Sequence, residues 1–185
     1  QASLNPSPIP PTNPSPPNIP NPKLNETVII EGTYTGSPIT FNLDEFLPLP
    51  SQLPPGGLGS DAFPTGPLKV TLVWTDPAGT AHGNGLDETT SVLVNDLDLS
   101  ITAPNGTAYN PWTLDPNNPT NAAVRTQANH IDNVEQVFID PVDIQRGQYT
   151  INLDNTGTLT NGSQDYSLLI SRNDWGWTNP ENNAP

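Results

Sequence analysis

The chain has 185 residues, of which 19 are acidic and five are basic, so its formal net charge at pH 7 is −14. This excess of carboxylates argues against nucleic acid or an anionic membrane surface as a partner, since both require clustered lysine and arginine. Cysteine is absent, which excludes disulfides, thiol catalysis and thiolate metal sites, and no apolar run approaches the roughly 20 residues of a membrane-spanning helix.

The first 22 residues contain nine prolines. Proline fixes φ near −65° and has no N–H to donate, so residues 1–22 are predicted to form an extended polyproline II arm or linker without a hydrogen-bonded element. If the arm adds a strand to a sheet, we expect the pairing to be limited to residues near 23–34, because proline cannot donate to a ladder.

Residues 23–174 are predicted to form one β domain. Alternating apolar and polar residues, separated by turns rich in Gly, Asn and Pro, predict short strands at 27–34, 39–43, 68–75, 91–102, 107–109, 134–139, 147–153 and 165–171. Residues 48–67 are rich in proline and glycine, and residues 175–185 form a polar tail with Trp175 and Trp177. The pattern favours an all-β fold, an antiparallel jelly roll or β-sandwich.

The same alternation predicts which side chains enter the core. The apolar faces of four strands are formed by Val70, Leu72 and Trp74, by Leu97, Leu99 and Ile101, by Tyr149, Ile151 and Leu153, and by Tyr166, Leu168 and Ile170.

Oxygen-bearing side chains cluster where several of these strands begin or end. Asp96 and Asp98 are two residues apart, so both project from one face of their strand. Ca²⁺ takes roughly six to eight oxygen ligands, which loops of β proteins supply at strand ends. The predicted calcium ligands are Asp76, Asn95, Asp96, Asp98, Asn133 and Glu135. The alternative is that Asp96 and Asp98 lie on a solvated strand face, while Asn95 and Asn133 satisfy backbone groups at turns.

Catalytic motifs are missing from the sequence. Ser37, Ser60 and Ser163 each follow a glycine, but none lies in a G-x-S-x-G elbow or before a helical pattern. His82 and His130 are about 50 residues apart and give no zinc-ligand spacing; we expect both to be surface or hydrogen-bonded residues. The sequence therefore predicts that the chain is not an enzyme.

Four segments carry a family resemblance: LKVTLVWTDP at 68–77, VLVNDLDLSI at 92–101, HIDNVEQVFI at 130–139 and GQYTINL at 147–153. In this order, residues 68–171 resemble the β-barrel or jelly-roll domain that follows the catalytic domain in some secreted subtilisin-like serine proteases, a relative of the kexin P-domain. The resemblance implies a non-catalytic domain that packs on the protease, stabilises it and carries calcium, with Asp96, Asp98 and Glu135 among the ligands. The long proline arm departs from the family pattern, because the family's domain normally follows the catalytic unit closely.

Three functions are compatible with the sequence. The first is an accessory domain whose partner is its own protease catalytic domain. The second is a self-assembling extracellular structural subunit, of filament or surface-layer type, whose arm docks on a neighbouring copy to form a homo-oligomer. The third is an adhesive or carbohydrate-binding module using Tyr109, Trp112, Trp175 or Trp177, although packing is the simpler role for these aromatic residues.

Each of these functions implies a secreted or cell-surface protein. Methionine is absent, even at position 1, and we therefore expect a processed product or an excised piece. The sequons at Asn25, Asn105 and Asn161 are as frequent as chance allows and are no evidence of glycosylation.

Overall fold

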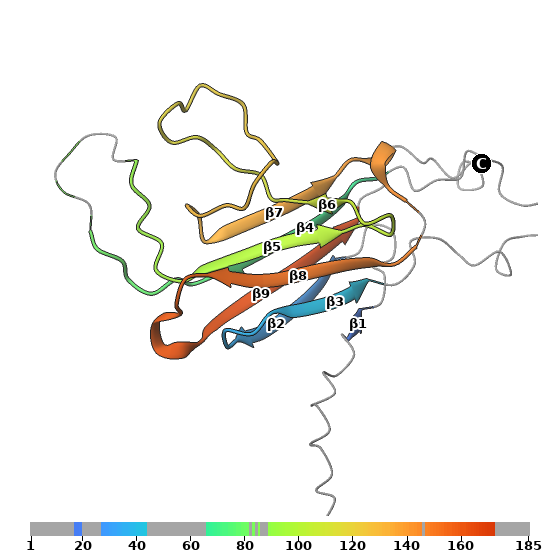
Figure 1. The fold of residues 1–185 in the computed structure, drawn as a ribbon, viewed down its shortest axis with the longest axis horizontal. Coiled ribbons are helices and arrows are strands. Elements are labelled where there is room, and N and C mark those ends of the chain that lie inside the picture. The colour runs from blue at the N-terminus through green and yellow to red at the C-terminus, as the bar shows by residue number, and fades with distance from the viewer. Residues whose placement is uncertain are drawn as a thin grey trace, which may run out of the picture.

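The computed structural model describes residues 17–19, 27–43, 66–81, 83, 85, 89–145 and 147–172 (Figure 1). The strands form two sheets. One has the order β1 (Asn18–Ile19), β3 (Ile39–Leu43), β8 (Tyr149–Thr156), β5 (Asp96–Thr102) and β6 (Ala108–Tyr109); the other has the order β2 (Thr27–Tyr34), β9 (Gln164–Arg172), β4 (Leu68–Trp74) and β7 (Val134–Ile139). The predicted all-β antiparallel sandwich is confirmed.

Helical structure in the described residues is limited to two short 3₁₀ turns, Pro141–Asp143 and Thr160–Gly162. In this part of the chain no helix has the length and apolarity needed to cross a membrane. The predicted tail at 175–185, the segment 48–65 and most of the arm lie outside the described residues.

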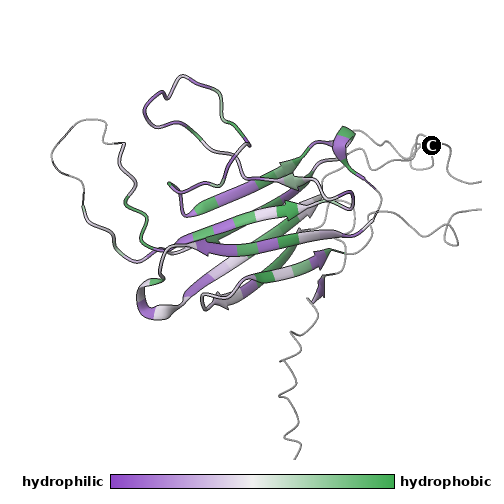
Figure 2. Cartoon of the chain, in the orientation of Figure 1, coloured by the Kyte–Doolittle hydropathy of each residue, from purple (hydrophilic) through white to green (hydrophobic). Residues whose placement is uncertain are grey.

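The core lies between the two sheets. All twelve residues predicted from the alternation are buried, and Tyr34, Leu43, Leu68 and Ile139 join them. Apolar and polar residues alternate along the strands in Figure 2, as expected when each strand buries one face. Because full burial of a Leu or Ile side chain stabilises a fold by about 1.5–3 kcal/mol, the contact between the sheets is the main source of stability.

The strand predicted at 91–102 is too long at its start, because β5 begins only at Asp96. The carboxylate of Asp76 accepts hydrogen bonds from the backbone N–H groups of Val94 (2.7 Å) and Asn95 (2.8 Å), which removes these donors from any strand ladder. The backbone of Gly79 also lies close to that of Val92, since a Cβ on Gly79 would be 2.2 Å from the carbonyl oxygen of Val92. This contact restricts the path of the residues before Asp96. Residues 91–95 therefore carry the apolar pattern of a strand but are not part of β5.

The prediction that residues 1–22 contain no hydrogen-bonded element is wrong at 17–19. Asn18 and Ile19 form β1, which pairs in parallel with Asn42 and Leu43 of β3. The N–H of Asn42 donates to the carbonyl of Pro17 at 3.1 Å. Proline lacks a donor but keeps its acceptor, so a two-residue gap between prolines is enough for a short edge strand, earlier in the chain than the expected 23–34.

Candidate metal centre

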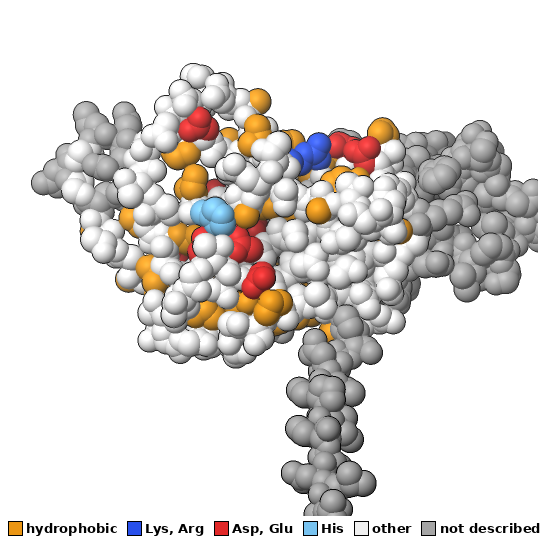
Figure 3. All heavy atoms as spheres, viewed as in Figure 1, with side chains coloured by type: hydrophobic (Ala, Val, Ile, Leu, Met, Phe, Trp, Pro, Cys, Tyr) orange, Lys and Arg blue, Asp and Glu red, His pale blue; other side chains and the backbone are white. Residues whose placement is uncertain are grey.

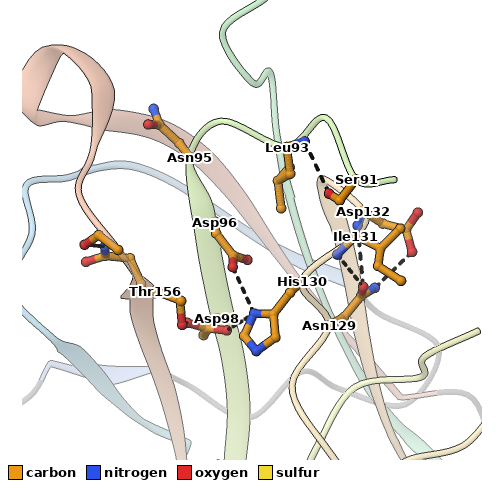
Figure 4. Close-up of polar contacts among 12 residues, drawn as sticks. Ser91, Leu93, Asn95, Asp96, Asp98, Asn129, His130, Ile131, Asp132 and Thr156 are labelled. Carbon is orange, nitrogen blue, oxygen red and sulfur yellow. Dashed lines mark hydrogen bonds and ion pairs between the residues drawn. The ribbon is translucent and has the colours of Figure 1, made fainter. Parts of the chain in front are cut away.

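Asp96 and Asp98 lie on the outer face of the first sheet, at the start of β5, and the imidazole of His130 lies against both (Figure 4). Nδ1 of His130 is 2.8 Å from Oδ2 of Asp96 and 3.6 Å from Oδ1 of Asp98. One potential ligand atom from each residue lies within 4.8 Å of the others. We call these three residues the Asp–His cluster.

The cluster is only partly open to solvent. The side chains of Asp96 and Asp98 are 17% and 19% exposed, whereas that of His130 is 51% exposed. Figure 3 shows an imidazole beside acidic side chains on this face of the molecule. A cation could reach the cluster from solvent, and the carboxylates behind the imidazole are largely shielded.

His130 is positioned by the side chain of Asn129, which is buried. Oδ1 of Asn129 accepts from the backbone N–H groups of Ile131 (3.0 Å) and Asp132 (3.4 Å), and Nδ2 donates to the carboxylate of Asp132 at 3.0 Å (Figure 4). This Asx-type turn folds the loop before β7 locally. The result is a loop whose shape brings the imidazole back over β5.

Two carboxylate oxygens in the cluster have no hydrogen-bond partner among the described residues. These are Oδ1 of Asp96 and Oδ1 of Asp98, both of which are buried. The other oxygen of Asp98 accepts from the Thr156 hydroxyl at 2.9 Å. A buried oxygen that gives up water without gaining a donor costs free energy, and an ordered water or an ion is the usual explanation for such an atom.

Glu135 adds a buried carboxylate from the opposite sheet. It is fully buried on β7, and its Oε2 accepts from the backbone N–H of Leu99 in β5 at 2.7 Å. Its Oε1 is the third buried carboxylate oxygen without a partner in the described part of the chain. Burial raises the pKa of Glu135 to about 9; the backbone N–H groups of Leu99 and Asn129 oppose this, and the charges of Asp98 and Asp96 add to it.

The pKa values of the two aspartates are also raised, and for each of them some contacts act in the opposite direction. Burial is the largest cause of the raised pKa of Asp96, followed by the charge of Asp98, while His130 acts in the lowering direction. Burial also raises the pKa of Asp98, against the lowering effects of the Thr156 hydrogen bond and the charge of His130. Three crowded carboxylates whose pKa values are all raised would gain from a bound positive charge.

The other three predicted ligands lie in a separate hydrogen-bond network, which we call the strand-end network: Asp76, Asn95 and Asn133. Asn95 donates through Nδ2 to Gln164 (2.8 Å) and accepts through Oδ1 from the N–H of Thr160 (2.7 Å). Figure 4 shows its side chain turned away from Asp96. Nδ2 of Asn133 donates to the carbonyl of Trp74 at 2.7 Å.

The structure therefore separates the six predicted ligands. Asp96 and Asp98 come together, and Glu135 lies behind them at the Leu99 N–H. The strand-end network instead serves the backbone, as the alternative reading of Asn95 and Asn133 proposed. Sequence reasoning expected a hydrogen-bonded His130 but did not place it with the aspartates; because it lies in a loop, no periodicity marks it.

Trp112 is the best-placed aromatic residue for a sugar among those described, with 38% exposure. However, the guanidinium of Arg125 stacks 4.5 Å from its ring centre. The same guanidinium donates to the carbonyl of Phe138 (2.6 Å) and to Asp140 (2.9 Å), which fixes it over the ring. That face of Trp112 is thus in use within the protein, while Trp175 and Trp177 lie outside the described residues.

No protein-family model matches the sequence, and no curated protein matches it either. The likeness of residues 68–171 to the protease-associated domain thus stays an expectation from the sequence.

Proposed function

We propose that this chain is a non-catalytic extracellular domain that binds a divalent cation and serves as an accessory to a secreted subtilisin-like serine protease. The observation that carries the proposal is the pair of buried, unpartnered carboxylate oxygens of Asp96 and Asp98 beside His130. A cation bound there would offset the repulsion between the carboxylates and join the loop before β7 to β5. Calcium is the ion implied by the family resemblance.

The strand order supports the finer assignment of the sandwich as a jelly roll. Apart from β1, the sheets have the orders β3-β8-β5-β6 and β2-β9-β4-β7. Successive strands from β2 to β9 change sheets at every step except β5 to β6. Eight antiparallel strands in two facing sheets of four, with this alternation, are typical of a jelly roll, the fold class in which the resembling domains are found.

The cation is tested by thermal unfolding of the full chain in a chelator and in saturating CaCl₂. Ligand at 100 times its Kd adds about 2.7 kcal/mol to the free energy of unfolding, and a domain of this size gains about 2–4 °C per kcal/mol. We expect Tm to rise by roughly 5–10 °C. Identical melting curves in chelator and in an excess of several divalent ions would contradict the proposal.

The accessory role has its own measurement. The chain is immobilised and the catalytic domain of a secreted subtilisin-like protease is passed over it, with an unrelated serine protease as control. We expect saturable binding to the subtilisin-like domain alone and slower thermal inactivation of that domain in the complex, because a ligand of the folded state stabilises it by mass action. Equal responses to the two proteases would refute the accessory role and leave cation binding intact.

Self-assembly is the second candidate, and one observation bears on it directly. Within the described residues β1 covers only Asn42 and Leu43 of β3, so the edge of β3 over Ile39–Phe41 is open to a strand from a neighbouring copy. β1 itself pairs within its own chain, which favours a connector for residues 17–19. Size-exclusion chromatography of the chain with and without residues 1–19 separates the two: an oligomer that needs these residues would favour assembly.

A further inference from the structure

We infer that the Asp–His cluster selects a first-row transition-metal dication, with Zn²⁺ as its probe, over Ca²⁺. This inference rests on the proposed divalent-cation site and adds the class of ion. It follows from the donor atoms, from the number of oxygens that are free, and from the buried Glu135 side chain that holds β5 behind the cluster.

The donor atoms come first. Nδ1 of His130 lies between the two carboxylates, 2.8 Å from Asp96 and 3.6 Å from Asp98. An ion bound by both aspartates would therefore also meet the imidazole. Imidazole nitrogen suits Zn²⁺ and other first-row transition ions, whereas Ca²⁺ prefers oxygen ligands throughout.

The number of oxygen ligands at the cluster also favours a transition-metal ion over Ca²⁺. Ca²⁺ needs roughly six to eight oxygens, but the cluster offers the unpartnered Oδ1 atoms of Asp96 and Asp98. The second oxygen of Asp98 is held by the Thr156 hydroxyl, and the strand-end network is occupied with the backbone. Two carboxylates, one imidazole and a water match the four-coordinate arrangement of Zn²⁺ sites that keep one open position.

The buried acid behind the cluster is an independent observation. Glu135 is fully buried, has an unpartnered Oε1, and is bonded through Oε2 to the N–H of Leu99, the residue that follows Asp98. This bond holds the part of β5 that carries the two aspartates against β7 before any ion binds.

The imidazole is also held ready before any ion binds. The turn around Asn129 fixes the loop on both sides of His130 through bonds to Ile131 and Asp132. Little conformational entropy is then lost when the nitrogen joins the two carboxylates. Asn129 acts here as a positioning residue.

The experiment titrates the full metal-free chain with Zn²⁺, Co²⁺ and Ca²⁺ by calorimetry, and records the visible spectrum with Co²⁺. We expect Zn²⁺ to bind at least about tenfold more tightly than Ca²⁺, and bound Co²⁺ to show visible bands of low coordination number. His130→Ala should weaken Zn²⁺ by more than about tenfold, since even changes outside the ligand set often cost that much, and should leave the Ca²⁺ response nearly unchanged. His82→Ala, at the sequence's other histidine, is the matched control.

Each outcome decides the inference. Ca²⁺ binding as tightly as Zn²⁺, or Zn²⁺ binding that survives His130→Ala, overturns the ion class and leaves the proposed cation site standing. Loss of Zn²⁺ binding in His82→Ala instead would place the ion elsewhere and overturn the inference as well. If none of the three ions binds the intact chain, the inference and the proposed cation site fail together. The Co²⁺ spectrum of the unaltered chain needs no variant, so misfolding of a variant cannot account for it. Thermal unfolding of His130→Ala and His82→Ala shows whether each variant is folded before its Zn²⁺ binding is compared.

Discussion

The strand-end network and the Asp–His cluster are built from similar side chains, and Asn95 and Asp96 are adjacent in the sequence. In the network, both functional atoms of Asn95 are hydrogen-bonded, and the carboxylate of Asp76 accepts from two backbone N–H groups. In the cluster, Oδ1 of each aspartate is buried without a hydrogen bond from the described residues. Spare acceptor capacity therefore marks the candidate site better than residue type does.

The largest expected effect is on the pH dependence of folding stability. A carboxyl group whose pKa is raised on folding binds more protons in the folded state, so stability is lost as pH rises from its ordinary value to the folded value. With the pKa of Glu135 raised to about 9, and those of Asp96 and Asp98 raised as well, the metal-free chain should lose stability between about pH 4.5 and 9. The loss should be on the order of a few kcal/mol.

Urea unfolding across this pH range measures the effect. Glu135→Gln keeps the shape and the acceptor for Leu99 and should flatten the dependence. A variant with the same slope as the original chain would show that Glu135 is not the source, and stability that rises with pH throughout the window would contradict the description of the buried carboxylates.

Asn95→Ala, in the strand-end network, should give the next largest loss of folding stability. It leaves the amide of Gln164 and the N–H of Thr160 without their partner, and breaking a buried network of this kind costs about 2–4 kcal/mol. The cation-induced rise in Tm should persist, because Asn95 turns away from the cluster. Loss of the cation response in a folded Asn95→Ala variant would make Asn95 part of the site.

Asp98→Asn tests the Asp–His cluster and should change the folding stability by a smaller amount. Replacing one of the crowded carboxylates should stabilise the metal-free chain by about 0.5–1 kcal/mol and abolish the response to cations. Asp165→Asn removes the same charge from an exposed residue of β9 that accepts from Thr33, and should leave the cation response unchanged. Equal behaviour of the two variants in calorimetric titration would mean that net charge, rather than the cluster, attracts the ion.

Thr156→Val should have the smallest effect. It removes the hydroxyl that orients Asp98, at a cost of about 0.5–1 kcal/mol for a single hydrogen bond. Cation affinity should fall by only a fewfold, because both free Oδ1 atoms remain. A loss as large as that in Asp98→Asn would show that Thr156 itself contributes a ligand.

Part of this molecule could be predicted from sequence. The alternation of Leu97, Leu99 and Ile101 places Asp96 and Asp98 on the opposite face of their strand, because successive side chains of a strand point to opposite sides. The start of β5 could not be predicted, since it depends on Asp76 taking the N–H groups of Val94 and Asn95 from across the fold.

The sequence by itself determined most of the strands, the buried face of four of them and the common face of the two aspartates, because these follow from a period of two within a single segment. Only the tertiary structure decided which oxygens are spent on the backbone, which remain free, and that His130 joins them. Those outcomes depend on contacts between separate segments, such as Asp76 with Val94 and His130 with Asp96, for which no local pattern carries a signal.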